Sequence, residues 1–266
     1  MTAPGLTLSG FGVGYGRVAV LDGLEVPTVA PGTVVGLLGA NGAGKSTLLR
    51  ALAGLQQARG RAVLDGTDLM AADGAHRLRT VAYLPQSLPQ PTPLLAYEAV
   101  LVALRATRPD LTTTQAEAVI EDVFAGLGLE SLALRRLAQL SGGQRQMVGL
   151  AQVLARDPRL LLLDEPTSAL DLRWQISVLD RVRALAADRG AIALIAIHDI
   201  NLATRFCHRL MILGQGGILA DGPTAQVLNP EVLSRAYGIQ GRVETCSQGF
   251  PIVLADSAHT ARRRIS

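Results

Sequence analysis

Three features of the sequence predict an α/β fold with a largely parallel sheet at its core. Short apolar runs at 34–38, 160–163 and 193–197 are separated by helical patterns, as in doubly wound sheets. An alternating segment near the N-terminus predicts an antiparallel β subdomain. Residues 94–137 show helical patterns with no strand between them, which predicts an inserted α-helical subdomain.

The N-terminal elements follow from local patterns. Alternating residues over 6–13 and 24–29 predict two antiparallel strands, which follow one another across a turn at Asp22-Gly23. The first apolar run is followed by a glycine-rich turn and a helical pattern over 48–55 that ends near Gly54. Strand, loop and helix are therefore expected in succession.

The later elements are predicted in the same way. Helices are expected over 96–104 and 115–127, with Asp110 or one of residues 112–114 as an N-cap. The other expected elements are strands over 62–64, 81–84 and 210–213, a proline-rich connector over 85–93 and a helix over 172–185.

The composition is that of a folded protein without a membrane span. Hydrophobic residues make up 48% and charged residues 18% of the chain, and the apolar stretches are far shorter than the roughly 20 residues that cross a bilayer. The first ten residues have no leader pattern, and Cys207 and Cys246 lack the spacing of a disulfide framework or a metal site. We therefore expect a cytosolic protein with reduced thiols. The basic run at 262–264 is expected to be a frayed tail, with weak attraction to an anionic membrane surface or nucleic acid as the alternative. Because the net charge is only +3, no nucleic-acid partner is expected.

A phosphate-binding loop is predicted at 39–47, where GANGAGKST fits G-x-x-x-x-G-K-[ST] between a predicted strand and helix. Its backbone N–H groups would surround the phosphates, Lys45 would reach the β and γ phosphates, and Ser46 would bind a magnesium ion. Lys45 is also the only lysine of the chain. A tight glycine turn is the simpler alternative. The expected nucleotide-binding residues of the loop are Gly39, Asn41, Gly42, Gly44, Lys45, Ser46 and Thr47.

Two acids end the apolar run at 160–163. Asp164 and Glu165 would lie at the carboxyl edge of the sheet, where such folds bind ligands. Asp164 suits a magnesium ion, and Glu165 suits a general base that acts on water. Solvated acids that merely end a strand are the alternative.

A second phosphate site is predicted at the segment 141–144. Ser141 fits an N-cap, and the exposed N–H groups of Gly142 and Gly143 would form an anion pocket together with the helix dipole. Gln144 completes this segment. By itself the pattern also fits an ordinary helix cap.

Taken together, these motifs resemble the nucleotide-binding subunits of ABC transporters, whose signature sequence is matched in full by LSGGQ at 140–144. The resemblance covers nearly the whole chain. It implies a P-loop NTPase fold of the ABC cassette type, and an ATPase that uses ATP and Mg²⁺. It also implies a homodimer in which the signature of one subunit closes over the ATP on the phosphate loop of the other.

The resemblance assigns roles to further residues. Tyr15 matches the aromatic residue that stacks on adenine, although such a residue is more often part of the core. Gln86 resembles the glutamine that touches magnesium and the attacking water, and His198 resembles the histidine that contacts the γ-phosphate. Asp171 lies in SALD, which resembles the loop that crosses the dimer interface. The implied catalytic residues are Lys45, Gln86, Glu165 and His198, and the implied magnesium ligands are Ser46, Gln86 and Asp164.

Less specific motifs indicate the kind of transporter. HDINLATRF at 198–206, LDLRWQ at 170–175 and the C-terminal segments 227–239 and 249–253 resemble ATPases that energise uptake of ferric siderophores, haem or cobalamin. Integral membrane permease subunits, and indirectly an external substrate-binding protein, are then the implied partners. The implied location is the cytoplasmic face of the membrane. An importer of another small solute, a nucleic-acid ABC ATPase and a regulator without turnover are the alternatives.

The resemblance also implies four parts of the chain. They are 1–92, the N-terminal part of the ATP-binding core with the antiparallel strands and the phosphate loop (Walker A); 93–140, the helical subdomain; 141–240, the signature helix and the rest of the core; and 241–266, a C-terminal extension with the basic tail.

Overall fold

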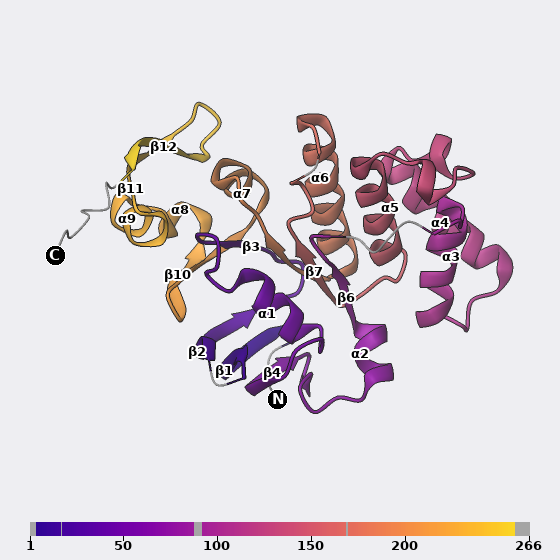
Figure 1. Ribbon diagram of the computed structural model, residues 1–266, viewed down its shortest axis with the longest axis horizontal. Coiled ribbons are helices and arrows are strands. Elements are labelled where there is room, and N and C mark those ends of the chain that lie inside the picture. Colours follow the sequence, from indigo (N-terminus) through magenta and orange to yellow (C-terminus); the bar gives the residue numbers. More distant parts are fainter. Residues whose placement is uncertain (1–3, 17, 88–91, 169, 259–266) are drawn as a thin grey trace.

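The computed structural model describes residues 4–16, 18–87, 92–168 and 170–258, and its centre is a six-stranded sheet, which Figure 1 shows between helices. The strand order is β10-β9-β3-β8-β7-β6, with β10 antiparallel to β9 and the other neighbours parallel. The expected α/β fold with a largely parallel core is confirmed. The strands are β3 (Val34–Leu38), β6 (Val81–Leu84), β7 (Leu160–Asp164), β8 (Ile192–Ala196), β9 (Arg209–Gly214) and β10 (Gly217–Pro223).

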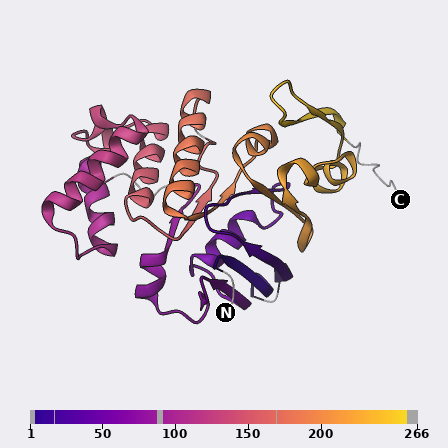
Figure 2. The same ribbon diagram turned by 180° about the vertical axis from the view of Figure 1, so that it is seen from behind.

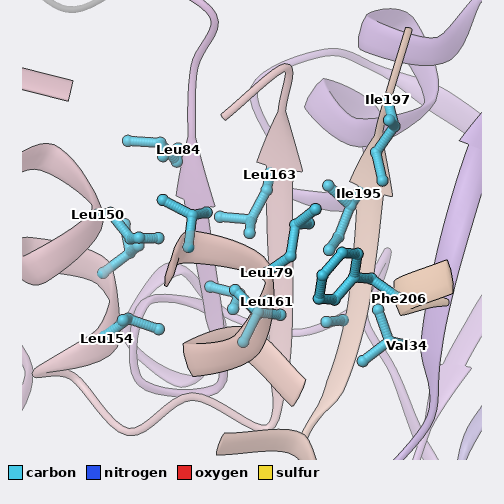
Figure 3. Close-up of a cluster of buried hydrophobic side chains, with 14 of the residues drawn as sticks. Val34, Leu84, Leu150, Leu154, Leu161, Leu163, Leu179, Ile195, Ile197 and Phe206 are labelled. Atoms are coloured by element: carbon cyan, nitrogen blue, oxygen red, sulfur yellow. The ribbon is translucent and has the colours of Figure 1, made fainter. Parts of the chain in front are cut away.

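Both faces of this sheet are covered. Along β7, Leu161 and Leu163 face one core cluster, while Leu160 and Leu162 face another. Figure 3 shows Leu161 and Leu163 among side chains that come from helices on the first face. Burial on both faces explains why β7 and β8 are apolar runs rather than alternating strands.

A second, four-stranded sheet has the order β2-β1-β4-β5 and is antiparallel throughout. The predicted turn at Asp22-Gly23 is wrong, because β2 continues through it. Gly23 has φ +60° where β2 carries one residue more than β1, which is a β-bulge. The hairpin closes instead between Tyr15 and Val18, which pair across it. The strands are β1 (Leu6–Tyr15), β2 (Val18–Val29), β4 (Ala58–Leu64) and β5 (Thr67–Asp68).

The helices of the core follow the sheet strands. The helix predicted over 48–55 is α1, but Leu55 lies beyond its end and is exposed, because Gly54 in the left-handed region stops the helix. The short helix α2 was not predicted, since it buries no residue and so shows no apolar period. The helices are α1 (Lys45–Leu52), α2 (Gly74–Thr80), α6 (Leu172–Arg189) and α7 (Ile200–Phe206).

The helical lobe is formed by α3 (Ala96–Thr107), α4 (Thr113–Leu127) and α5 (Gly142–Leu154), with short 3₁₀ turns at Glu130–Leu132 and Leu137–Gln139. Helices α3 and α4 pack on α5, and Figure 1 shows this lobe at one end of the molecule. Thr112 is the N-cap of α4, so one of the expected caps is confirmed. Leu150 of α5 belongs to the same buried cluster as Leu163 of β7, so the lobe and the sheet share one core.

The C-terminal part lies at the opposite end from the helical lobe (Figure 2). It comprises α8 (Thr224–Val227), α9 (Pro230–Tyr237) and an antiparallel hairpin of β11 (Ile239–Thr245) and β12 (Pro251–Ala258). The expected extension at 241–266 is thus a folded hairpin as far as Ala258, while the basic tail lies outside the described residues. The four-part division of the chain stays a prediction.

Two expectations from composition can be compared with the described residues. Cys207 and Cys246 are both free thiols, and Cys207 is buried. Over the described ranges, every helix is too short or too polar to span a bilayer.

Candidate nucleotide site

The phosphate loop joins β3 to α1 in the way the sequence predicts. Gly39 has φ +137°, and a Cβ there would come within 2.4 Å of the carbonyl oxygen of Leu213. Gly44 precedes the first turn of α1 with φ +98°. Both positions therefore require glycine, because a side chain would be strained at each and would clash at Gly39.

Lys45 lies folded back over its own loop. Its Nζ donates hydrogen bonds to the carbonyl oxygens of Gly39 (2.6 Å) and Ala40 (3.2 Å). Burial lowers the pKa of Lys45, and the carboxylates of Glu165 and Asp164 oppose that shift. The ammonium is buried, next to two acids, and positioned at the start of the loop.

Asp164 ends β7 directly beside the phosphate loop. The Ser46 hydroxyl donates a hydrogen bond to its Oδ1 (2.8 Å), and the Tyr83 hydroxyl donates one to its Oδ2 (3.2 Å). Burial raises the pKa of Asp164, while these two hydrogen bonds lower it in part. Two of the three residues that the resemblance assigns to magnesium, Ser46 and Asp164, are thus in contact although 118 positions separate them.

Glu165 is held from two sides. Its Oε1 lies 2.5 Å from Nε2 of His198, and its Oε2 accepts a hydrogen bond from Nε2 of Gln86 (2.6 Å). Its backbone has φ +54°, a left-handed conformation that costs a non-glycine residue energy and is common at functional sites. Two residues expected from separate motifs, Gln86 and His198, therefore converge on the carboxylate of Glu165.

These side chains surround a pocket of about 430 Å³. Val20 adds an apolar patch to its wall, and Tyr15, 55% exposed, stands in the same wall. Ten predicted site residues line the pocket: Tyr15, Asn41, Gly42, Gly44, Lys45, Ser46, Thr47, Gln86, Glu165 and His198.

The predicted signature does not line this pocket. Ser141 is the N-cap of α5 and forms a capping box with Gln144: the amide of Gln144 donates to the Ser141 hydroxyl (3.2 Å), and the amide of Ser141 donates to the Gln144 side chain (3.0 Å). Gly142 and Gly143 begin the same helix. Within one chain, the signature and the phosphate loop are therefore parts of separate surfaces.

Asp171 also stands apart from the pocket. Its carboxylate accepts a hydrogen bond from the amide of Trp174 (3.0 Å) and caps α6. The loop that the sequence assigns to a dimer interface includes residue 169, which lies outside the described residues. Its role at an interface stays a prediction.

Tyr83 is a site residue that the sequence did not reveal. It lies on β6, three residues before Gln86, and its hydroxyl contacts Asp164 on the neighbouring strand β7. Burial raises the pKa of Tyr83. The available signal was a tyrosine in an apolar edge strand, since a buried tyrosine hydroxyl needs a polar partner.

The donor set at this pocket fits a magnesium ion. A serine hydroxyl, a carboxylate and a side-chain amide supply the hard oxygen ligands that Mg²⁺ prefers. The described residues contain no group of three or more His, Cys, Asp or Glu that could hold a metal by themselves.

A phosphate loop between β3 and α1, with an acid from the end of the parallel strand β7 on its serine, defines the chain as a P-loop nucleotide hydrolase. The family profile described as ABC transporter matches residues 25–168. The chain belongs to the ABC transporter family, as one of its ATP-hydrolysing subunits.

Curated relatives are described as import ATP-binding proteins. The chain is 41% identical over 228 residues to a hemin import ATP-binding protein, HmuV, of Bordetella avium, an alignment that covers 81% of this chain and 85% of the relative. The HmuV protein of Burkholderia pseudomallei is 39% identical over 256 residues, with 89% and 94% covered.

Solved structures agree in fold. A metal-chelate type ABC transporter in an inward-facing conformation matches with a TM-score of 0.77 and 26% identity, covering 95% of this chain and 97% of the other. A dimeric ATP-binding cassette with bound ADP and phosphate, in a post-hydrolysis state, matches with a TM-score of 0.74 and 26% identity, covering 82% and 98%.

Proposed function

We propose that this chain hydrolyses ATP, as a homodimer on the cytoplasmic face of the membrane, to power an importer for haem, a ferric siderophore or cobalamin. The convergence of Gln86, Glu165 and His198 beside Lys45 carries the catalytic part of the proposal. The hemin-import relatives and the metal-chelate type neighbour support the cargo class. Permease subunits would bind the dimer, and an external binding protein would select the cargo.

Catalysis would depend on positioning and on charge. Lys45 would turn from the carbonyl oxygens of its loop toward the β and γ phosphates, where its charge opposes theirs. Glu165, fixed between Gln86 and His198, would orient a water molecule and accept its proton. A magnesium ion at Ser46, Asp164 and Gln86 would neutralise phosphate charge.

Dimerisation would complete the site. Gly142 and Gly143, next to Ser141, offer N–H groups at a helix N-terminus, which suit a phosphate, and Tyr15 offers a ring face that suits adenine. Ser141 and Tyr15 would contact different parts of the nucleotide, but they lie on separate surfaces of one chain. A second copy facing the first would therefore place ATP between the Tyr15 of one copy and the Ser141 of the other.

The Glu165→Gln variant tests the catalytic part. We expect it to bind MgATP, to accumulate as a dimer on size-exclusion chromatography, and to release phosphate about 100-fold or more slowly than the wild type. Glu117→Gln, which removes an exposed carboxylate on α4, is the control for the loss of one charge. A Glu165→Gln chain that stays monomeric with MgATP, or that hydrolyses it normally, would contradict the proposal.

The cargo class needs a separate test. The chain, purified with its permease in lipid vesicles, should hydrolyse ATP and accumulate haem, a ferric siderophore or cobalamin when the matching binding protein is supplied. Uptake of none of these three, in vesicles that hydrolyse ATP, would favour an importer of another small solute.

A further inference from the structure

Tyr237 connects the C-terminal part to the phosphate loop. It is the last residue of α9, which Gly238 ends in the left-handed region. The backbone N–H of Gly39 donates a hydrogen bond of 3.0 Å to the Tyr237 hydroxyl, between residues 198 positions apart. Gly39 is buried, so its N–H would otherwise have no water to bond to.

Tyr237 and Lys45 both contact Gly39. The carbonyl oxygen of Gly39 accepts the 2.6 Å hydrogen bond from the Lys45 ammonium, while its N–H is bonded to Tyr237. The space beside its Cα is closed by the carbonyl of Leu213. Gly39 is thus held at its N–H, its carbonyl oxygen and its Cα, and the contact at its N–H comes from a segment outside the sheet and the loop.

A second contact fixes the same C-terminal part near His198. The side chain of Asn201 on α7 accepts a hydrogen bond from the amide of Val253 (2.8 Å) and donates one to its carbonyl oxygen (3.3 Å). Asp199, directly after His198, caps α7. The segment from α9 to β12 therefore contacts both the start of the phosphate loop and the helix that follows His198.

The hydroxyl of Tyr237 is suited to hold the Gly39 N–H whether or not a nucleotide is bound. Burial raises its pKa to about 12, so it stays an uncharged phenol at physiological pH. A neutral hydroxyl accepts the N–H of Gly39 without placing a negative charge beside incoming phosphates. The contact is therefore compatible with both the free and the ATP-bound loop.

We propose that Tyr237 is a positioning residue, which holds the phosphate loop at Gly39 in the shape that receives ATP. Without this hydroxyl the start of the loop would be less ordered, and ATP would have to order it on binding. Since bound phosphates would then hold the loop themselves, the loss should appear in ATP affinity rather than in turnover. The inference rests on the proposed binding of ATP at this loop.

The Tyr237→Phe variant tests it, because the ring and its packing remain. We expect the Kd and KM for MgATP to rise about three- to tenfold, the range for one lost hydrogen bond, while kcat changes by less than about twofold. Tyr97→Phe is the matched control, since Tyr97 is another partly buried tyrosine packed against the same core cluster, and its affinity should stay at the wild-type value.

Two outcomes would overturn the inference. One is a Tyr237→Phe chain whose affinity for MgATP equals that of Tyr97→Phe, and the other is a fall in kcat at unchanged affinity. Lys45→Ala separates this failure from that of the proposed function. If Lys45→Ala weakens ATP binding and Tyr237→Phe does not, only the role of Tyr237 is wrong, whereas normal binding by Lys45→Ala would refute the ATP site itself.

A second measurement needs no variant. Hydrogen exchange of the Gly39 amide in the wild-type chain without nucleotide should be slow, because the N–H is bonded to Tyr237. Exchange at the rate of a free loop amide would overturn the inference even if Tyr237→Phe failed to fold.

Discussion

Asp164 combines a functional position with a cost in stability. Its carboxylate is fully buried, and burial raises its pKa, so the folded state disfavours the ionised form. Ser46 and Tyr83 offset only part of this effect. A buried carboxylate of this kind stabilises the fold less when charged than when neutral, which suits a residue kept for a cation.

Asp164→Asn should therefore give a more stable chain with an impaired site. An amide can still accept from Ser46 and can donate to the oxygen of Tyr83, and it carries no charge. At neutral pH we expect Tm to rise on the order of 3 °C and MgATP hydrolysis to be lost. Differential scanning calorimetry and phosphate release measure the two effects.

The difference in stability between the wild type and Asp164→Asn should depend on pH in a definite direction. Below the unfolded pKa of about 3.9, Asp164 is protonated in both states and the wild type carries no buried charge. As pH rises from there through the raised folded pKa, the wild type loses stability and the variant does not. The gap in Tm should open over that window, while Asp188→Asn, at an exposed carboxylate, controls for the loss of one charge. An Asp164→Asn chain less stable than the wild type at neutral pH would contradict this.

At the residue scale, local motifs were enough to predict most of the residues that line the pocket. Lys45, Ser46 and Glu165 could be predicted because phosphate chemistry requires those groups at fixed spacings from glycines and a strand end. Tyr83 and Tyr237 could not, since each acts through a single hydroxyl whose partner is on a distant segment. A contact between distant segments that forms only on folding leaves no local pattern in the sequence.

At the scale of the elements, two helices of the lobe begin with the same device. Thr112 and Gln115 form a capping box at α4, and Ser141 and Gln144 form one at α5. The local energetics of the two caps should therefore be alike. Only the second lies in the segment proposed to face a phosphate.

Ser141→Ala and Thr112→Ala separate helix capping from function. Each removes one side-chain acceptor from a helix N-terminus and should lower the free energy of unfolding by about 1 kcal/mol, measured by urea titration. Only Ser141→Ala should also weaken ATP-dependent dimerisation and hydrolysis. Equal losses of activity in both variants would mean that the signature acts solely as a cap.

The elements that the sequence predicted well are those with apolar periodicity. β7 and β8 are buried on both faces, and α5 follows a clear cap, so each has a strong local signal. The turn at Asp22-Gly23 was wrong because a glycine in a β-bulge has the same sequence signature as one in a hairpin. The hairpin of β11 and β12 was missed since most of its residues are exposed, so it has no apolar alternation.

For the molecule as a whole, the central feature is that the two surfaces proposed to bind phosphate are separate. The pocket beside Lys45 lacks the signature, and the signature at Ser141 belongs to another surface. Defects in the two surfaces should therefore be able to compensate for each other between chains.

Mixing two inactive variants tests this arrangement. In a Glu165→Gln background, Lys45→Ala and Gly143→Asp chains should each fail to form a dimer with MgATP. A mixture should form dimers that retain a single nucleotide, because one of the two interfaces combines an intact Lys45 with an intact Gly143. Nucleotide content after size-exclusion chromatography is the measurement. A mixture that stays monomeric would contradict the composite pocket.

The global arrangement could be predicted only in outline. Alternating strands and helices gave the parallel sheet, and the helical stretch gave the lobe. The strand order, and the return of the C-terminal part to β3 through Tyr237, depend on packing between segments far apart in the chain. Such packing leaves no periodic trace in any one of them.

The burial of the only lysine has a practical consequence. Lys45 is 6% exposed and bonded to its own loop, so reagents that acylate amines would find no side-chain amine on the protein surface. Coupling to a sensor chip or a dye through amines would then be directed to the α-amino group. Modification of Lys45 itself would report how often the loop opens, and bound nucleotide would protect it.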